Sequence, residues 1–294
     1  MKRILFTLLI LFAATQMYSQ SGKVFDELTM ESKILKSTRK YAIYLPPDYE
    51  TSQRKYPVLY LLHGAGDDQT GWIQFGEVLH IADKAIREGK ATPMIIVMPD
   101  ANTGRRGYFN DIRGDFNYED FFFQELIPHI EKTYKAKSEK RFRGIAGLSM
   151  GGGGTLVYAL HKPEMFAAAC PLSAAVRVTT PQLLRERYNA DGKISDEKLN
   201  EWYKQYDIIG MVESMPDLKE LENRRNMGDK MVRFYIDCGD DDFLIEGNCM
   251  LHIAMTKKGY PHEFRVRDGG HTWEYWRTAL PEVLFFVSQS FHQF

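Results

Sequence analysis

An α/β fold with a doubly wound, mainly parallel sheet and a helical, lid-like insertion is predicted by three features of the sequence. Short, continuously apolar segments alternate with longer segments whose apolar residues recur at helical spacing. Most of the apolar segments run into loops rich in glycine or aspartate, as expected at the ligand-binding edge of such a sheet. A polar stretch at 174–229 interrupts the alternation and predicts the insertion.

The N-terminal segment 1–21 has the pattern of a secretory signal peptide. Lys2 and Arg3 precede an apolar run, 4–14, that is too short to span a bilayer, and small residues follow it. We therefore expect a cleaved segment and a secreted or periplasmic protein without stable membrane insertion; an uncleaved membrane anchor is the alternative. The remaining chain, 22–294, has a length that suits one large α/β domain.

Charge and cysteine content narrow the functional classes. The chain has 38 Lys and Arg against 39 Asp and Glu, and loss of Lys2 and Arg3 with the signal peptide leaves 36 against 39. This balance indicates neither a nucleic-acid partner nor an anionic membrane surface. Three cysteines are too few for a disulfide-dependent scaffold. Either Cys238 and Cys249 form a bridge in an oxidising compartment, leaving Cys170 free, or all three are unpaired buried thiols.

The first half of the chain supplies three predicted strands and two predicted helices. In chain order these segments are 40–46, 56–62, 72–89, 93–99 and 118–134, of which the third and the fifth are helices. The first strand alternates between polar and apolar residues, whereas the other two are continuously apolar, as strands covered on both faces are. Pro128 lies inside the second helix and predicts a kink or a break there.

The second half of the chain continues the alternation after an apolar run that ends at Gly147. Strands are predicted at 166–172, 232–237 and 262–266, and helices at 155–161, 245–258 and 273–290. A sheet whose strands alternate with helices in this way is mainly parallel and carries helices on both faces.

Residues 143–154 carry the clearest chemical signature. Ser149 lies between Gly147 and Gly151, after an apolar run and before a helical segment. This Gly-x-Ser-x-Gly pattern is typical of a nucleophile elbow, a sharp strand-to-helix turn that strains the serine and exposes its hydroxyl. Glycine costs a helix roughly 1 kcal/mol relative to alanine, so the four successive glycines at 151–154 predict a close approach of the helix to the sheet.

A serine nucleophile needs a base, and His271 is the candidate. It lies in a glycine-rich loop after the last predicted strand, where its ring can reach Ser149. The acid that orients the base is expected after the preceding strand, where three aspartates are adjacent, and spacing alone does not choose among Asp240, Asp241 and Asp242. Such a run is also compatible with a solvated turn or a weak cation site, although it lacks the alternating spacing of a calcium loop.

Two backbone N–H groups are expected to form an oxyanion hole beside the serine. One belongs to Met150, the residue after the nucleophile, and the other comes from the glycine-rich loop 63–66.

The insertion 174–229 is expected to lie over the carboxyl edge of the sheet, where open α/β folds bind ligands. As a lid and acyl-pocket wall it would bring Trp202, Tyr203 and Tyr206 to the substrate, and Trp273 is a further candidate for substrate binding. The alternative is a surface decoration that only buries its aromatic residues against the domain.

Four motifs resemble those of the esterase D / feruloyl esterase group of α/β-hydrolases. They are Tyr-Leu-Leu-His-Gly at 60–64, Glu-Leu-Ile-Pro-His-Ile-Glu at 125–131, Gly-Leu-Ser-Met-Gly-Gly at 147–152 and Cys-Gly-Asp-Asp-Asp-Phe-Leu at 238–244. The resemblance covers about residues 35–290 and implies the α/β-hydrolase fold. The group's Cys-Gly-x-x-Asp-x-Leu pattern implies that Asp242 is the triad acid, and the match at 60–64 implies that the second oxyanion donor is the N–H of Ala65.

The group includes secreted feruloyl and acetylxylan esterases, S-formylglutathione hydrolases and mycolyltransferases. The resemblance therefore implies a serine esterase that releases feruloyl or acetyl groups from plant cell-wall polysaccharide, with an ester-substituted polysaccharide or oligosaccharide as its partner. An acyltransferase to a sugar acceptor and a general carboxylesterase or thioesterase are alternatives, and an intact nucleophile, acid and base argue against a non-catalytic binding module. The triad requires no cofactor and no metal, and the histidines show no tight ligand spacing.

Overall fold

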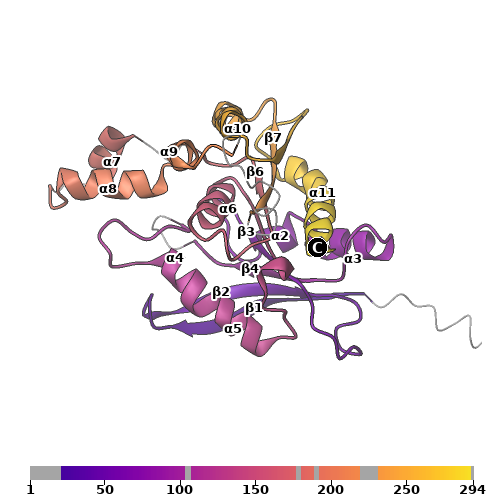
Figure 1. Cartoon of the computed structure of the whole chain (residues 1–294). Coiled ribbons are helices and arrows are strands. Elements are labelled where there is room, and N and C mark those ends of the chain that lie inside the picture. Colours follow the sequence, from indigo (N-terminus) through magenta and orange to yellow (C-terminus); the bar gives the residue numbers. More distant parts are fainter. Residues whose placement is uncertain (1–20, 103–106, 177–179, 189–191, 219–230, 293–294) are drawn as a thin grey trace, which may run out of the picture.

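The computed structural model describes residues 21–102, 107–176, 180–188, 192–218 and 231–292 (Figure 1). The predicted signal peptide lies outside these residues apart from Ser21, as do parts of the predicted insertion. Among the helices in these ranges, none combines the length and the apolar character needed to cross a membrane.

A mainly parallel sheet of eight strands forms the centre of the molecule, in the order β1-β2-β4-β3-β5-β6-β7-β8. The strands are β1 (Lys23–Ser32), β2 (Ser37–Leu45), β3 (Val58–Leu62), β4 (Ile95–Pro99), β5 (Arg143–Leu148), β6 (Ala168–Leu172), β7 (Arg233–Gly239) and β8 (His262–Arg267). β2 pairs antiparallel with both β1 and β4, and the other pairs are parallel. The predicted α/β fold is therefore confirmed.

Helices cover both faces of this sheet, as Figure 1 shows. They are α2 (Gly71–Gln74), α3 (Val78–Arg87), α4 (Tyr118–Phe121), the π-helix η1 (Phe122–Leu126), α5 (Ile127–Thr133), the 3₁₀ helix η2 (Lys140–Phe142), α6 (Met150–His161), α7 (Pro181–Tyr188), α8 (Asp196–Tyr206), α9 (Ile208–Ser214), α10 (Ile245–Lys258) and α11 (Trp273–His292). α3 and α11 bury their apolar residues on one face, whereas α5, α6 and α10 bury theirs on the other.

The alternation of side chains along β3 explains why both faces need a cover. Val58, Tyr60 and Leu62 belong to the apolar cluster under α6, whereas Leu59 and Leu61 belong to the cluster under α11. All five are fully buried, so the strand is continuously apolar in sequence.

Two predicted helices are irregular in the structure. The helix predicted at 72–89 stops at Gln74 and resumes at Val78, since Gly76 packs against Trp72 with no room for a side chain and Glu77 adopts a φ of 53°. The helix predicted at 118–134 is continuous but contains the π-helical turn η1 just before Pro128.

The π-helical turn has a physical cause in Pro128. Proline has no N–H to donate, and in a regular α-helix its ring would collide with the carbonyl four residues earlier. A wider turn in front of the proline removes that collision, and the predicted kink or break thus takes the form of a local widening.

The three cysteines are free thiols, so the structure favours the unbridged alternative. Cys170 and Cys238 are buried, whereas Cys249 on α10 is partly exposed.

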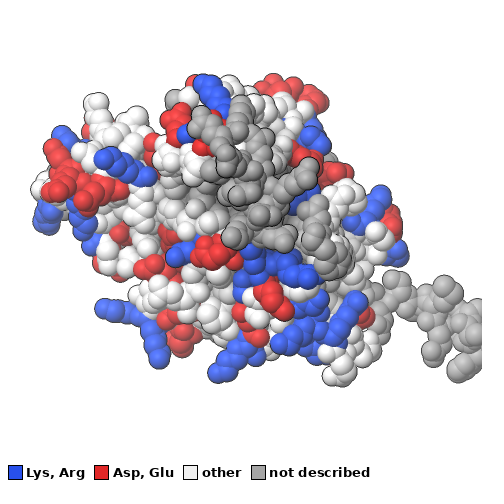
Figure 2. Space-filling view, in the orientation of Figure 1, with Lys and Arg blue, Asp and Glu red and all other residues white. Residues whose placement is uncertain are grey.

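Charged side chains of both signs are distributed over the face shown in Figure 2, with basic side chains gathered over its lower part. No single sign covers this face, in keeping with the near balance of acidic and basic residues in the sequence.

Candidate active site

Ser149 occupies a strained turn between β5 and α6. Its φ of 54° and ψ of −115° lie outside the regions that residues with a side chain normally adopt. Backbone hydrogen bonds hold it there: its N–H donates to the carbonyl of Leu172 (2.9 Å), and its own carbonyl accepts from Gly153 and Ala175 (3.0 Å each). The turn presents the serine side chain at the carboxyl edge of the sheet, as the elbow pattern predicts.

The glycines around Ser149 are required by the close approach of helix and sheet. A Cβ atom at Gly147 would lie 2.6 Å from the carbonyl oxygen of Gly151, and one at Gly151 would lie 2.6 Å from the carbonyl oxygen of His63. The next three glycines, 152–154, would collide in the same way with the backbone of residues 174 and 175 and with Tyr108. The predicted close approach is thus present along the first turn and a half of α6.

Three loops bring Ser149, His271 and Asp242 together. His271 follows β8 and its Nε2 lies 2.9 Å from Ser149 Oγ. Asp242 follows β7, and its carboxylate oxygens lie 2.8 and 3.0 Å from His271 Nδ1. Because a carboxylate accepts, the Nδ1–H donates to Asp242, and Nε2 is left to accept the serine proton.

Asp242 differs from its two neighbours in burial and in hydrogen bonding. It is almost fully buried, whereas Asp240 and Asp241 are exposed. Burial alone would raise the pKa of Asp242, but hydrogen bonds from His271, from the backbone N–H of Leu244 and from the Ser173 hydroxyl outweigh it and lower that pKa. A carboxylate in this setting stays ionised and can stabilise an imidazolium.

Aromatic side chains hold the imidazole from two sides. The ring of Trp276 meets His271 edge-on with a centroid distance of 4.8 Å, and the ring of Phe243 lies 4.5 Å away although 75% of that residue is exposed. Trp276 also donates its Nε1–H to Ser173 Oγ (3.0 Å). Phe243, Ser173 and Trp276 are not predicted from the sequence; the only signal for them is that Phe243 directly follows the acid and that Trp276 lies three residues after Trp273.

A pocket of about 320 Å³ opens beside the nucleophile. Its lining residues come from three loops and α11: Gly64, Ala65, Gly66, Asp67, Leu148, Ser149, His271, Trp273 and Trp276. Among the residues that the structure describes, the backbone N–H groups of Ala65 and Met150 have no acceptor. Two free donors next to a serine hydroxyl are what an oxyanion hole requires.

Trp273 lines this pocket and stands in an aromatic cluster. Its ring lies 5.2 Å from that of Trp72, 5.8 Å from that of Phe75 and 5.4 Å from that of Trp276. Of the four aromatic residues predicted to bind substrate, it is the one at the pocket.

The aromatic residues of the insertion lie elsewhere, which corrects the expectation that Trp202, Tyr203 and Tyr206 wall the pocket. Trp202 and Tyr206 are buried, and Tyr203 packs partly buried against the same core. Trp202 donates its Nε1–H to the carbonyl of Asn110 (2.8 Å). The hydroxyl of Tyr206 donates to Glu119 (2.9 Å).

The position of Tyr206 relative to α6 explains the correction. Its ring lies 5.5 Å from that of His161, the last residue of α6, whereas Ser149 precedes the first. At 1.5 Å per residue, the two ends of this helix are about 17 Å apart. The end of α8 is therefore fixed to the part of the domain remote from the nucleophile, as the alternative of buried aromatic residues anticipates.

Three exposed carboxylates gather beside the loop that carries His271. Asp240, Asp241 and Asp268 each bring one oxygen within 4.8 Å of the others, and Asp240 accepts the N–H of Gly269 (3.0 Å). That bond tethers the loops after β7 and β8 to each other. Exposed acidic groups of this kind are common without an ion, so the cluster is not assigned as a metal site.

Comparison with known proteins gives a consistent family signal. The family described as "Putative esterase" matches residues 32–287. A solved ferulic acid esterase is 37% identical, with a TM-score of 0.77 over 92% of this chain and 99% of that one. An acetyl esterase of Caldicellulosiruptor saccharolyticus is 22% identical over 90% of this chain and 97% of its own length.

A longer relative shares only one segment with this chain. The endo-1,4-beta-xylanase/feruloyl esterase of Xylanibacter ruminicola is 41% identical over an alignment of 135 residues that covers 42% of this chain. The match covers 18% of that relative, which is less than a fifth of its length.

Proposed function

The chain belongs to the esterase family, and from that premise we propose that it is a serine esterase acting on ester-substituted plant cell-wall polysaccharide or oligosaccharide, from which it releases feruloyl or acetyl groups. The observation that carries the proposal is the hydrogen-bonded series from Asp242 through His271 to Ser149 at a strained elbow beside two free N–H groups. The predicted signal peptide supports action outside the cytoplasm, as a secreted or periplasmic enzyme.

The proposed reaction follows from this geometry. Ser149 Oγ attacks the ester carbonyl while His271 Nε2 takes its proton, and the resulting oxyanion accepts from the N–H groups of Ala65 and Met150. Collapse of this intermediate expels the alcohol, which receives the proton from His271. Water then attacks the acyl-enzyme, again with His271 as base, and releases the acid and the free serine.

The aromatic cluster around Trp273 supports an aromatic acyl group. Trp72 and Phe75 belong to it: Trp72 is buried, whereas Phe75 is half-exposed. Flat aromatic side chains favour a flat aromatic ligand by edge-to-face and offset-stacked contacts. An acetyl group is the second candidate, because one relative of the chain is an acetyl esterase.

Hydrolysis of methyl ferulate, 4-nitrophenyl acetate and acetylated xylan tests the proposal, with Ser149→Ala as the matched control. A preference for methyl ferulate that disappears in Ser149→Ala identifies a feruloyl esterase. Turnover of the two acetyl substrates alone identifies an acetyl esterase. Undiminished activity of folded Ser149→Ala would contradict the mechanism, and transfer to an added sugar acceptor in preference to water would show an acyltransferase instead.

A further inference from the structure

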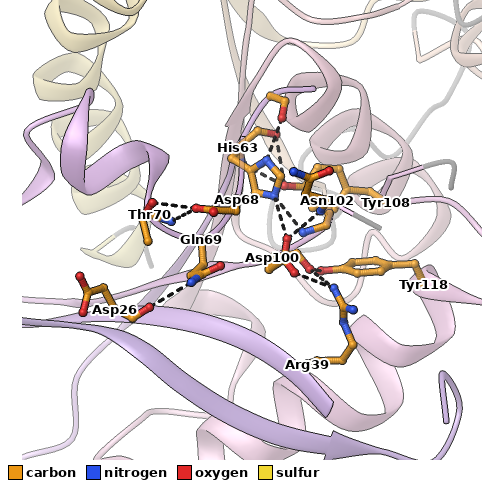
Figure 3. Close-up of polar contacts among 12 residues, drawn as sticks. Asp26, Arg39, His63, Asp68, Gln69, Thr70, Asp100, Asn102, Tyr108 and Tyr118 are labelled. Atoms are coloured by element: carbon orange, nitrogen blue, oxygen red, sulfur yellow. Dashed lines mark hydrogen bonds and ion pairs between the residues drawn. The ribbon is translucent and has the colours of Figure 1, made fainter. Parts of the chain in front are cut away.

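His63 is buried directly after β3 and connects two loops of the active-site edge (Figure 3). Its Nε2 lies 2.8 Å from the backbone nitrogen of Ala101, after β4, and its Nδ1 lies 2.8 Å from the carbonyl oxygen of Gly64. A backbone N–H can only donate and a carbonyl can only accept. These two contacts therefore assign the neutral ring with its proton on Nδ1.

The surroundings of His63 agree with a neutral ring. Burial lowers the pKa of His63 and outweighs the opposing hydrogen bond and nearby carboxylates. Asp100 Oδ1 is 3.9 Å from Nε2, but the carboxylate of Asp100 already accepts from Arg39 (2.9 Å) and from the backbone N–H of Asn102 (2.7 Å). The ring thus has both nitrogens occupied by backbone groups.

The hydrogen bond from His63 Nδ1–H to the Gly64 carbonyl affects the direction of the Ala65 N–H, because the peptide bond between Gly64 and Ala65 is planar. The carbonyl of Gly64 and the N–H of Ala65 belong to one trans peptide unit and point to opposite sides of it. The Gly64 carbonyl is held on the buried side by His63 Nδ1–H and by the N–H of Asp67 (3.4 Å). The N–H of Ala65 is thereby directed to the other side.

That other side is the pocket. Gly64 and Ala65 both line it with Ser149, and a Cβ atom at Gly64 would lie 3.5 Å from the Cβ of Ser149. The peptide unit that His63 holds is therefore adjacent to the nucleophile. Its free N–H is the donor that the oxyanion needs from this loop.

We propose that His63 is a positioning residue for the oxyanion hole, whose Nδ1–H fixes the Gly64–Ala65 peptide so that the N–H of Ala65 points at the substrate carbonyl. The inference rests on the proposed function and adds a role to it. His63 contacts no substrate; it acts through the peptide unit that follows it.

The backbone of His63 is held as well, as this role requires. The N–H of His63 donates to the hydroxyl of Tyr108 (2.9 Å), which donates in turn to the His63 carbonyl (3.2 Å). The hydroxyl of Tyr118 donates to the carbonyl of Asp100 (2.8 Å), and Arg39 on β2 binds the same residue (Figure 3). The network ties β2 and the ends of β3 and β4 together behind the pocket.

Two substitutions of His63 separate positioning from simple packing. In His63→Asn the side-chain Nδ2 is bonded to Cγ, as Nδ1 is in histidine, so its N–H can still donate to the carbonyl of Gly64. His63→Leu fills the site with a side chain that has no donor. We expect kcat to fall about a hundredfold in His63→Leu, as on loss of one oxyanion donor, and less than about tenfold in His63→Asn. KM should change little in either variant.

A trifluoromethyl ketone provides the second readout, because it forms a tetrahedral oxyanion on the serine. Its affinity should fall in His63→Leu by the same factor as kcat, since both depend on the oxyanion donors. His161→Leu is the matched control: His161 is also a largely buried histidine with two hydrogen bonds, to Glu119 (2.7 Å) and Gln205 (2.8 Å), but lies at the far end of α6. The His161→Leu variant should have a lower thermal stability than the wild type and an unchanged kcat.

Several outcomes would overturn the inference. Folded His63→Leu with a wild-type kcat would do so, as would an equal loss of kcat in both His63 variants. If His63→Leu does not fold, the ¹⁵N spectrum of the wild-type imidazole decides together with His63→Asn, and an Nε2–H tautomer refutes the assignment. Absence of any Ser149-dependent ester hydrolysis in the wild type would instead refute the proposed function, so the two failures are distinguishable.

Discussion

Asp240, Asp241 and Asp242 are three identical side chains in a row, and their surroundings alone give them different roles. Replacing Asp242 by Asn keeps its shape but presents an NH₂ group to His271, which then favours the wrong tautomer. We expect Asp242→Asn to lower kcat by about ten-thousandfold. Asp241→Asn is the matched control and should keep near wild-type kcat because that side chain is exposed. Equal losses in the two variants would contradict the assignment of the acid.

Trp273 is the aromatic residue through which substrate preference can be tested. Trp273→Ala should raise KM for methyl ferulate about fivefold, since an aromatic pair contributes about 1 kcal/mol beyond area burial. KM for 4-nitrophenyl acetate should change less, because its acyl group is small. Phe285→Ala serves as control: it removes a partly exposed aromatic residue from the same helix, outside the pocket lining. Equal changes with both substrates would argue against an aromatic acyl site.

At the scale of single residues, those whose chemistry depends on a local pattern can be predicted from the sequence. Ser149, His271 and the loop around Ala65 are recognisable because an elbow or a glycine-rich loop has a fixed composition. Ser173 acts through a contact with Trp276, which is distant in the sequence, and His63 binds Ala101 as well as its neighbour Gly64; no local pattern shows that these bonds form. His63 in particular reads as an ordinary loop residue until its two ring nitrogens are seen to bind backbone groups.

The contact between α6 and the ends of β3 and β6 sets the position of the nucleophile. Gly151→Ala would place a methyl group 2.6 Å from the His63 carbonyl oxygen and should lower the free energy of unfolding by about 1–3 kcal/mol. It should also lower kcat, because α6 relieves the clash by moving away from the end of β3, and Ser149 directly precedes this helix. Gly270→Ala is the control for stability, since its nearest atom would be 3.7 Å away. Urea unfolding measures the stability of the two variants. Equal stability of Gly151→Ala and Gly270→Ala would contradict the argument.

At the level of elements, the continuously apolar strands were the most predictable. β1 was missed because it is an edge strand whose residues are mostly exposed, so neither strict alternation nor an apolar run marks it. The π-helical turn before Pro128 could be anticipated only as an irregularity. Its form depends on how the helix on either side is held by the core.

Histidines that are buried or partly buried contribute to the pH dependence of stability of the whole molecule. The pKa values of His63, His129 and His252 are lowered by burial, so these side chains contribute stability above about pH 6.5 that is lost as the pH falls through their folded pKa. His161 opposes them: burial would lower its pKa, but the carboxylate of Glu119 raises it, and its contribution is lost as the pH rises.

The balance of these groups predicts that the free energy of unfolding rises between pH 5 and pH 7. His161→Gln should make the rise steeper, because the opposing group is removed. Urea unfolding at several pH values measures both slopes. A wild-type stability that falls over this range, or an unchanged slope in His161→Gln, would show that other groups dominate.

The placement of the insertion is what the sequence could not predict at the scale of the molecule. Its helical character and its aromatic residues are visible in the pattern. Which surface those aromatic residues cover depends on Phe109, Asn110 and Glu119, which precede them by some 90 residues and offer the partners for Trp202 and Tyr206.

The unbridged thiols give the native chain a ready attachment point for a fluorophore. Burial raises the pKa of Cys238 to about 12 and that of Cys170 well above its usual range, so both remain protonated and unreactive toward maleimide at neutral pH. Cys249 is partly exposed. It follows Asn248, whose side chain binds the backbone of Ala174 at the start of the insertion. A dye at this single position would report motion of that segment during turnover without any engineered cysteine.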